Sequence, residues 1–357
     1  MKAWIVAGLA LLLLLPVSTG WAIGTKTVTI QLSSGKKSVS YVSFHPSEPL
    51  ELRPALAQGK VGMTQELAQI AVNNKAVAAI NGTFFNPYDE NDLQPMGGII
   101  INGVPQHIRG GAVAMGITAS NELIFAPGNP YSVRGTINSG TQEEKEWSVQ
   151  YVNHLPTMTE TVLFTPSFRS ANLFIPGYHF VVITAGKVSG FSKEKAVIPS
   201  NGFVIARGGG TTGEGAFRVG DSVSYELTAS EAFKQAVHMI SVGPRLIAAG
   251  KAAVDTSTFT EAKITTQKAQ RSFIGCKADK TIMMGTVGNV TMQELTELGL
   301  KLGLTEAMAL DGGASSGLFY NGKYVTKAGR NLSNALVVVK KAPPAKPAAP
   351  PAPPVKK

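Results

Sequence analysis

Short runs of β-branched and aromatic residues, separated by Gly, Asn and Asp, dominate this sequence and constrain its fold more than any other feature. Such runs are typical of strands, because branched and aromatic side chains pack well on a pleated surface. The clearest predicted strands are 27–32, 98–101, 178–183, 203–206, 282–285 and 335–339. We therefore expect an α+β fold, a sheet-rich mixed α/β domain with extensive β-sheet and a few packed helices.

Two dipeptides, Asn102-Gly103 and Asn321-Gly322, lie between apolar runs and predict tight hairpins of type I′. Two helices are also expected. The first covers about 64–73. The second covers 291–303, where Thr291 and Glu294 have the spacing of a capping box, and this explains Glu294 without a catalytic role.

A weak internal duplication relates 65–82 to 293–312, since both segments read helix, strand and then a polar turn. The turns are Asn81-Gly82 and Asp311-Gly312. Chance similarity is the alternative. If the repeat is real, the two turns lie at related strand ends and face a common site.

The two ends of the chain differ from its centre. Residues 1–22 have the charged start, apolar run and small-residue end of a signal peptide, which predicts a secreted, periplasmic or otherwise extracytoplasmic protein without a transmembrane segment in the mature chain. Residues 340–357 contain only Lys, Ala, Pro and Val, a composition that predicts disorder. One domain is expected over 23–339. The basic tail either contacts an anionic envelope polymer or is a solvated spacer.

The net charge of +10 does not indicate a nucleic-acid partner. Six of the 33 basic residues are Lys2 and five tail lysines, which leaves 27 basic against 23 acidic residues. No Lys/Arg stripe is interleaved with aromatic residues. The five histidines form no HExxH pair, so no metal ligand is predicted. The lone Cys276 is expected to be buried and inert.

The segment Ala309–Gly317 concentrates charge and hydrogen-bond donors directly after an apolar run. Gly312 and Gly313 can adopt positive φ and aim backbone N–H groups at an anion, while Asp311 stands at the strand end as an acid, base or electrostatic group. Ser315 and Ser316 add donors. The alternative is a Gly-rich turn in which Asp311 bonds only its own backbone.

Five motifs in order resemble the phosphodiester glycosidase family, over about 75–339. They are Ala79–Phe85 (AINGTFF), Ile198–Val204 (IPSNGFV), Val242–Leu246 (VGPRL), Arg271–Gly275 (RSFIG) and Leu310–Ser316 (LDGGASS). Thr83 and Ala314 stand where the family often has glycine, and 283–287 lacks an expected acidic residue.

This resemblance implies an exported hydrolase that cleaves the bond between a sugar C1 and a phosphate oxygen in an envelope or extracellular glycan, with no nucleotide or redox cofactor. Its partner is then a sugar phosphodiester or glycan substrate. The catalytic candidates are Asp311 and Arg271. The substrate-binding candidates are Asn81, Gly312, Gly313, Ser315, Ser316 and Arg245.

Each role has a simpler structural alternative. Arg271 can pair with a carboxylate, Asn81 can be a turn residue, and His107 is expected at the surface beside a hairpin rather than as a general acid. Two other functions compete with hydrolysis of a sugar phosphodiester. One is a non-catalytic glycan-binding or envelope-assembly protein, and the other is a metal-dependent phosphodiesterase that uses Asp311 as a ligand.

Overall fold

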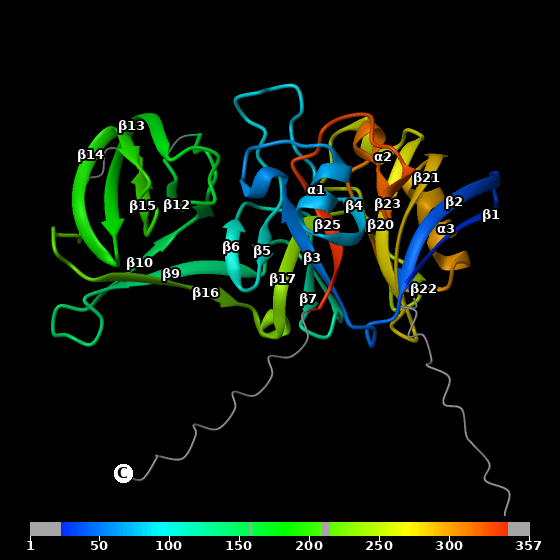
Figure 1. The fold of residues 1–357 in the computed structure, drawn as a ribbon, viewed down its shortest axis with the longest axis horizontal. Coiled ribbons are helices and arrows are strands. Elements are labelled where there is room, and N and C mark those ends of the chain that lie inside the picture. Colours follow the sequence, from blue (N-terminus) through cyan, green and yellow to red (C-terminus); the bar gives the residue numbers. More distant parts are fainter. Residues whose placement is uncertain (1–22, 158, 209–214, 342–357) are drawn as a thin grey trace, which may run out of the picture.

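The chain forms a body and a lobe, joined through the strand pair β9 (Tyr131–Ile137) and β16 (Val223–Ala229) (Figure 1). The structure is a computed structural model that describes residues 23–157, 159–208 and 215–341. The predicted signal peptide lies outside these residues, as does the predicted tail beyond Lys341. Lys340 ends β25, and the Lys341 backbone N–H donates to the Pro49 carbonyl at 2.9 Å. The first two tail residues are therefore ordered.

Three sheets make up the body. In spatial order, sheet A contains β1 (Gly24–Leu32), β2 (Gly35–Phe44), β21 (Ile282–Val290), β20 (Ala269–Lys277), β22 (Leu304–Ala309), β18 (Arg245–Ala248) and β19 (Lys251–Ala252). Sheet B contains β24 (Lys323–Thr326), β23 (Leu318–Tyr320), β4 (Ala76–Asn81), β25 (Asn334–Lys340) and β3 (Leu50–Leu56). Sheet C contains β6 (Val104–His107), β5 (Ile99–Ile101), β17 (Ala236–Val242), β7 (Val113–Thr118) and β8 (Leu123–Pro127).

Two sheets make up the lobe. Sheet D contains β11 (Tyr151–Val152), β12 (Thr161–Phe164), β15 (Gly202–Arg207), β13 (Asn172–Thr184) and β14 (Lys187–Val197). Sheet E contains β10 (Lys145–Val149), β9 (Tyr131–Ile137) and β16 (Val223–Ala229). Among the described strands, only β11 and β12 pair in parallel. The sheet-rich α+β prediction is confirmed, and the predicted strands are present.

Helices are short and few in the described part of the chain. They are α1 (Leu67–Asn73), α2 (Ala262–Thr265) and α3 (Met292–Lys301), with 3-10 turns η1 (Ala57–Gly59), η2 (Glu231–Phe233) and η3 (Gly313–Ser315). The capping box of Thr291 and Glu294 is confirmed at the start of α3. Helix α1 begins later than predicted, because Gln65 pairs with Leu332 in a β-bridge. Within the same residues, no helix combines the length and apolar character that a membrane span requires.

Both predicted hairpins are present. Asn102 and Gly103 have φ of 52° and 71°, and Asn321 and Gly322 have φ of 45° and 82°. Two consecutive residues with positive φ are the mark of a type I′ turn, whose twist matches that of the flanking strands. The Asn-Gly signal therefore fixed the strand pairs β5–β6 and β23–β24.

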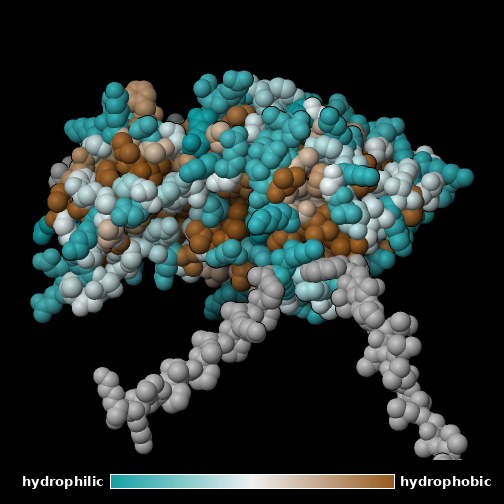
Figure 2. All heavy atoms as spheres, viewed as in Figure 1, coloured by the Kyte–Doolittle hydropathy of each residue, from teal (hydrophilic) through white to brown (hydrophobic). Residues whose placement is uncertain are grey.

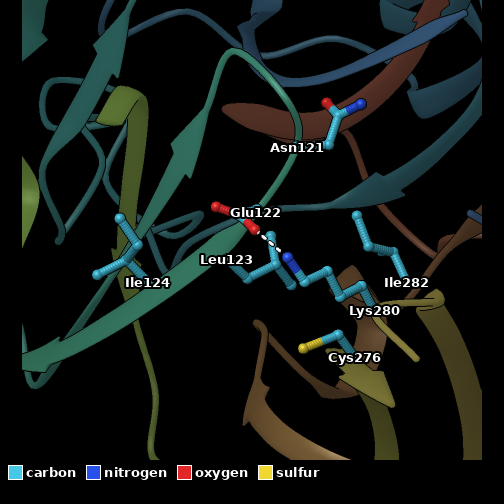
Figure 3. A pocket seen from close by; sticks show the side chains of 7 residues that line it. All are labelled: Asn121, Glu122, Leu123, Ile124, Cys276, Lys280 and Ile282. Atoms are coloured by element: carbon cyan, nitrogen blue, oxygen red, sulfur yellow. Dashed lines mark hydrogen bonds and ion pairs between the residues drawn. The ribbon is translucent and has the colours of Figure 1, made fainter. Parts of the chain in front are cut away.

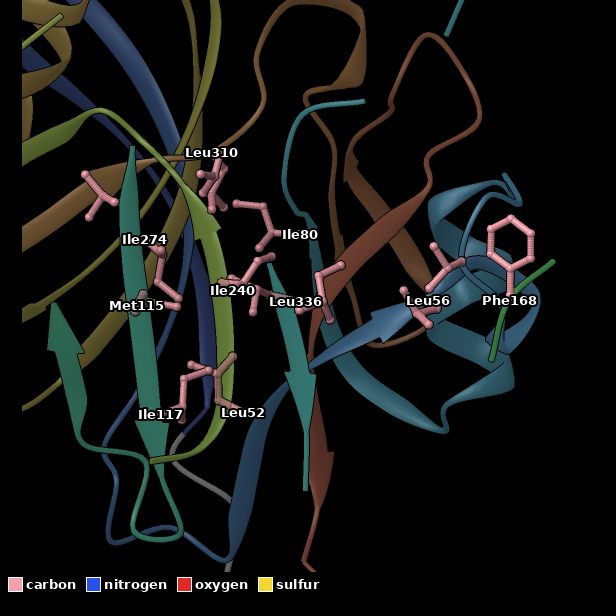
Figure 4. Close-up of a cluster of buried hydrophobic side chains, with 14 of the residues drawn as sticks. Leu52, Leu56, Ile80, Met115, Ile117, Phe168, Ile240, Ile274, Leu310 and Leu336 are labelled. Atoms are coloured by element: carbon pink, nitrogen blue, oxygen red, sulfur yellow. The ribbon is translucent and has the colours of Figure 1, made fainter. Parts of the chain in front are cut away.

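An apolar cluster lies between the three sheets of the body and continues into sheet D of the lobe through Phe164 and Phe180. Figure 4 shows Ile274 and Leu310 from the sheet A side, Ile80 and Leu336 from sheet B, and Met115 and Ile240 from sheet C directed toward one another. All six side chains are fully buried. On the outside, Figure 2 shows hydrophobic residues interspersed with polar ones over both body and lobe, as is usual for a folded surface.

Candidate active site at Asp311

Asp311 lies where the chain leaves sheet A and meets the turn that follows β4. The Leu310 backbone N–H donates to the Ser272 carbonyl of β20, and the Asp311 N–H donates to the Gly82 carbonyl at 3.0 Å. Just before the two turns, Leu310 and Ile80 are buried side by side in the core (Figure 4). The core therefore holds the two polar turns against each other.

This meeting joins the two segments of the proposed repeat. Helix α1 leads to β4 and Asn81, and helix α3 leads to β22 and Asp311. The strands belong to different sheets, yet the Asn81 side-chain amide donates to the Asp311 carbonyl at 2.6 Å. The two turns thus share one site, as expected if the repeat is real.

Asn81 is bound on both sides of its side-chain amide. Its Oδ1 accepts from the Ser272 hydroxyl at 2.7 Å and from the Gly317 N–H at 3.1 Å, in addition to the bond that its Nδ2 donates to Asp311. The residue is only 1% exposed. Asn81 therefore connects three segments beneath the Asp311 turn, and the sugar contact predicted for it stays a prediction.

The Gly-rich turn bonds partly to itself. The Gly312 N–H donates to the Asp311 carboxylate at 2.8 Å, which is the bond expected of the simple-turn alternative. Gly313 has φ of 61°, the positive value predicted, and η3 follows. Ser315 hydrogen-bonds the Asp311 carboxyl, whereas the buried Ser316 hydroxyl has no partner within the described residues. The N–H of Gly312 is thus directed to the carboxylate, and the anion contact predicted for it stays a prediction.

Burial raises the pKa of Asp311 from 3.8 to about 7, and Glu261 adds to this rise. The hydrogen bonds from Ser315 and Gly312, together with the positive charge of Arg330, lower the pKa and only partly offset the effect of burial. A carboxyl with a pKa near neutrality exchanges a proton readily at working pH. Asp311 therefore has the property that acid–base chemistry requires.

Arg271 lies next to this turn, but its guanidinium donates most of its hydrogen bonds to backbone carbonyls. Its Nη2 donates to Lys263 at 2.6 Å and to Gln267 at 2.7 Å, and its Nε donates to Val290 at 3.3 Å. Nη1 makes none of these bonds, and it would lie 3.4 Å from a Cβ at Gly312. Nη1 thus lies beside the turn, at ordinary van der Waals distance from a side chain at position 312. The predicted carboxylate pair is absent among the described ion pairs, and phosphate binding stays a prediction.

Arg245 is not brought to Asp311. Its Nε donates to the Ile247 carbonyl at 2.8 Å, its Nη2 pairs with Glu306, and its guanidinium stacks 4.2 Å from the centre of the Phe125 ring. Glu306 precedes Asp311 by five positions in the chain, roughly 15 Å in an extended strand. The substrate-binding role predicted for Arg245 thus has no support from its position.

A cavity of about 210 Å³ lies near that end of sheet A (Figure 3). It is lined by 121–124, Cys276, Lys280 and Ile282, and an ion pair between Glu122 and Lys280 crosses it. Burial and Glu306 raise the pKa of Cys276 to about 11, so the thiol stays protonated, although the residue is only partly buried and its predicted inertness stays a prediction. The chemistry expected at Asp311 does not coincide with this cavity.

His107 is fully buried, so the prediction of a surface position is wrong. Its Nδ1 is 3.0 Å from the Gly97 carbonyl, and its ring meets that of His154 edge-on at 5.9 Å. Burial lowers the pKa of His107 to about 3, and it lowers that of His154 to about 4. Both rings are therefore neutral at physiological pH. Within the described residues, no group of three or more His, Cys, Asp or Glu side chains is placed to hold a metal ion.

Sequence reasoning missed four charged or polar residues around Asp311. The charges of Arg330 and Glu261 act on the Asp311 carboxyl, and those of Arg330 and Lys263 act on Tyr88. Arg330 and Tyr88 lie on loops, whereas Glu261 and Lys263 lie at the start of the four-residue helix α2, which no sequence pattern predicted. The Gly329-Arg330 pair after β24 was the one local signal that could have drawn attention to that loop.

A sequence profile of the phosphodiester glycosidase family matches residues 178–339. Four of the five motifs lie within that range, and Ala79–Phe85 lies outside it. No curated protein matches the chain.

Solved structures share the fold. A hypothetical protein from Synechocystis has a TM-score of 0.76 and 22% identity, over 88% of this chain and 62% of that one, so this chain spans less than two thirds of its length. A protein from Burkholderia pseudomallei K96243, described as a candidate exported protein, has a TM-score of 0.67 and 19% identity, over 85% of this chain and 74% of that one. The catalytic domain of zebrafish N-acetylglucosamine-1-phosphodiester alpha-N-acetylglucosaminidase, auto-inhibited by its pro-peptide, has a TM-score of 0.50 and 12% identity, over 90% of this chain and 85% of that one.

Proposed function

We propose that the protein is an exported hydrolase of a sugar phosphodiester. The basis is the match of residues 178–339 to the phosphodiester glycosidase family. The bond cleaved joins C1 of a sugar to a phosphate oxygen in an envelope or extracellular glycan. The signal-peptide pattern of residues 1–22 and the family together support this proposal.

The observation that carries the proposal is one carboxyl, Asp311, with a pKa of about 7 beside hydrogen-bond donors and a cation. Phosphate leaves easily, so the reaction depends more on water activation and on stabilising charge than on a strong acid. In the deprotonated state, Asp311 takes a proton from water as the water oxygen bonds to C1. The bond from C1 to the phosphate oxygen breaks, and its electron pair leaves with the phosphate.

The surrounding residues have distinct roles in this proposal. Asn81 and Ser272 position the backbone of Asp311, and Ser315 orients its carboxyl. Arg271 holds the 261–268 segment against the turn, and its Nη1 beside Gly312 is the part that we assign to the substrate phosphate. Gly312, Gly313 and Ser316 shape the turn around this position. Arg245 has no role in the proposed reaction.

Hydrolysis in oxygen-18 water tests the reaction class. The purified mature protein is incubated with a panel of sugar 1-phosphodiesters, and the label is located by mass spectrometry. We expect label on the C1 hydroxyl of the sugar and none in the released phosphate monoester. Label in the phosphate, with activity lost to a chelator, would establish the metal-dependent phosphodiesterase instead. Saturable glycan binding without sugar release would favour the non-catalytic alternative.

A further inference from the structure

Three loops border the Asp311 turn. The Gly329 N–H donates to the Ala314 carbonyl at 2.8 Å, which holds the loop 327–333 against the turn. Arg271 fixes the loop 253–268 through the Lys263 carbonyl. Phe259 of that loop packs edge-on against Phe84 of the loop 82–98, with 6.1 Å between ring centres. The loops are therefore placed by contacts with each other and with the turn.

Arg330 is a cation without a carboxylate partner in the described residues. Its side chain forms none of the ion pairs found there. Its Nη2 donates instead to the Tyr88 phenol oxygen at 3.3 Å, and its guanidinium lies 5.3 Å from the centre of the Tyr88 ring. Its positive charge also acts on the Asp311 carboxyl. Arg330 thus has a neutral, replaceable partner, and it lies on a loop that is hydrogen-bonded to the Asp311 turn.

Tyr88 is exposed and lies within the field of two cations. The residue is 79% exposed, and its pKa is lowered by the bond from Arg330 and by the charges of Arg330 and Lys263. A neutral phenol is a weaker acceptor than a charged oxygen, and Arg binds phosphate through two parallel bonds. A phosphate group would therefore displace Tyr88 from Arg330.

We propose that Arg330, flanked by Tyr88 and Lys263, is the main binding group for the phosphate of a phosphodiester at the Asp311 site. This inference rests on the proposed function and names the recognition element for its substrate class. Glu261 acts on the same two groups, Asp311 and Tyr88, with a negative charge. When Arg330, Lys263 and Arg271 are counted against Glu261 and the ionised Asp311, one net positive charge remains, which complements the single negative charge of a phosphodiester.

Binding of dimethyl phosphate, a small monoanionic phosphodiester, tests this assignment without requiring turnover. The affinity of the full mature chain is measured by NMR titration for the wild type, Arg330→Gln, Arg330→Lys and Tyr88→Phe. We expect Arg330→Gln to weaken binding roughly ten- to hundredfold, as for the loss of hydrogen bonds to a charged group. Lysine should restore only part of the affinity. Tyr88→Phe should bind at least as tightly as wild type.

Arg134→Gln provides a matched control, because it removes the same charge from an exposed position on β9 of the lobe. It should bind dimethyl phosphate like the wild type. Equal affinity of wild type and Arg330→Gln, or no detectable binding to the wild type, would overturn the inference.

The same variants separate this inference from the proposed function. If the wild type hydrolyses sugar phosphodiesters and Arg330→Gln has an unchanged KM, the hydrolase stands and the Arg330 assignment fails. If dimethyl phosphate binds through Arg330 but no sugar phosphodiester is cleaved, the anion site stands and the hydrolase fails.

Discussion

The substitution Asp311→Asn should make the protein more stable at alkaline pH while removing its activity. Burial raises the pKa of Asp311 from 3.8 to about 7. Each pKa unit corresponds to about 1.4 kcal/mol, so ionising this carboxyl costs the folded state up to about 4 kcal/mol. Because the residue keeps some accessible surface, this figure is an upper value. Asparagine retains an acceptor for the Gly312 N–H and carries no charge.

The effect of the Asp311 charge on the free energy of unfolding depends on pH. Below pH 3.8 the carboxyl is protonated in both states and costs nothing. Between pH 3.8 and about 7 the unfolded chain has lost the proton that the folded chain keeps, so stability falls as pH rises, and above that range the cost is complete. The stability gain of Asp311→Asn over wild type should therefore be close to zero near pH 4 and reach a few kcal/mol at pH 8.

Urea unfolding of both proteins at the two pH values measures this difference, and steady-state turnover is measured alongside. Turnover should fall by at least about a hundredfold, the scale for losing an acid–base group. Asp255→Asn is the control, since that exposed carboxyl has a pKa lowered by Ser257 and should give no gain at pH 8. An equal stability difference at pH 4 and pH 8 would refute the argument from burial, and near-normal turnover would remove Asp311 from the mechanism.

Three further outcomes are expected. In the wild type, kcat/KM should rise with pH to a plateau with an apparent pKa near 7; a profile with no transition there would exclude Asp311 as the base. Arg271→Lys should lower stability and turnover almost as much as Arg271→Ala, because a single ammonium nitrogen cannot reach at once the three carbonyls that the guanidinium bonds from Nε and Nη2. Full rescue by lysine in both assays would show that charge alone suffices. A chain ending after Lys341 should keep the thermal stability of the full chain, whereas one ending after Val339 loses the end of β25 that pairs with Leu50 as well as the Lys341 bonds to Pro49 and Ala119, and should melt lower. Equal melting temperatures for the two would show that these contacts contribute nothing.

Features that depend on neighbouring residues could be predicted from the sequence. The Asn-Gly pairs set both hairpins through the φ values that they permit, and Thr291 with Glu294 set the start of α3. The position of Asp311 at a strand end followed from an apolar run that stops at a charge. These rules act over a few residues, so they gave elements and turns.

Contacts between distant segments could not be predicted in this way. Asn81 and Asp311 are separated by 230 positions, and nothing local shows that the amide of one holds the backbone of the other. The same limit explains Arg271, whose carbonyl partners Lys263 and Gln267 lie in and just after the short helix α2, which no sequence pattern predicted. It also explains the wrong expectation that His107 is exposed. The ring of His154, which covers His107, comes from the lobe, and no local pattern around His107 shows this contact.

The strand order of sheet B bears on how the protein comes to be assembled. Strand β4 pairs with β23 on one edge and with β25 on the other, and β25 also pairs with β3. The early strands β3 and β4 can therefore pair in this sheet only after the last part of the chain has been synthesised. Until that part arrives, the apolar run of β4 has no partner, and such unpaired edges attract other chains. Asn81 ends β4 and hydrogen-bonds the Asp311 carbonyl, so the buried environment that raises the pKa of Asp311 forms only after the C-terminal strands have paired with β4. A chain synthesised from its N-terminus can therefore complete the Asp311 site only when nearly its full length is available, and this delay is the stage at which a folding helper would matter most.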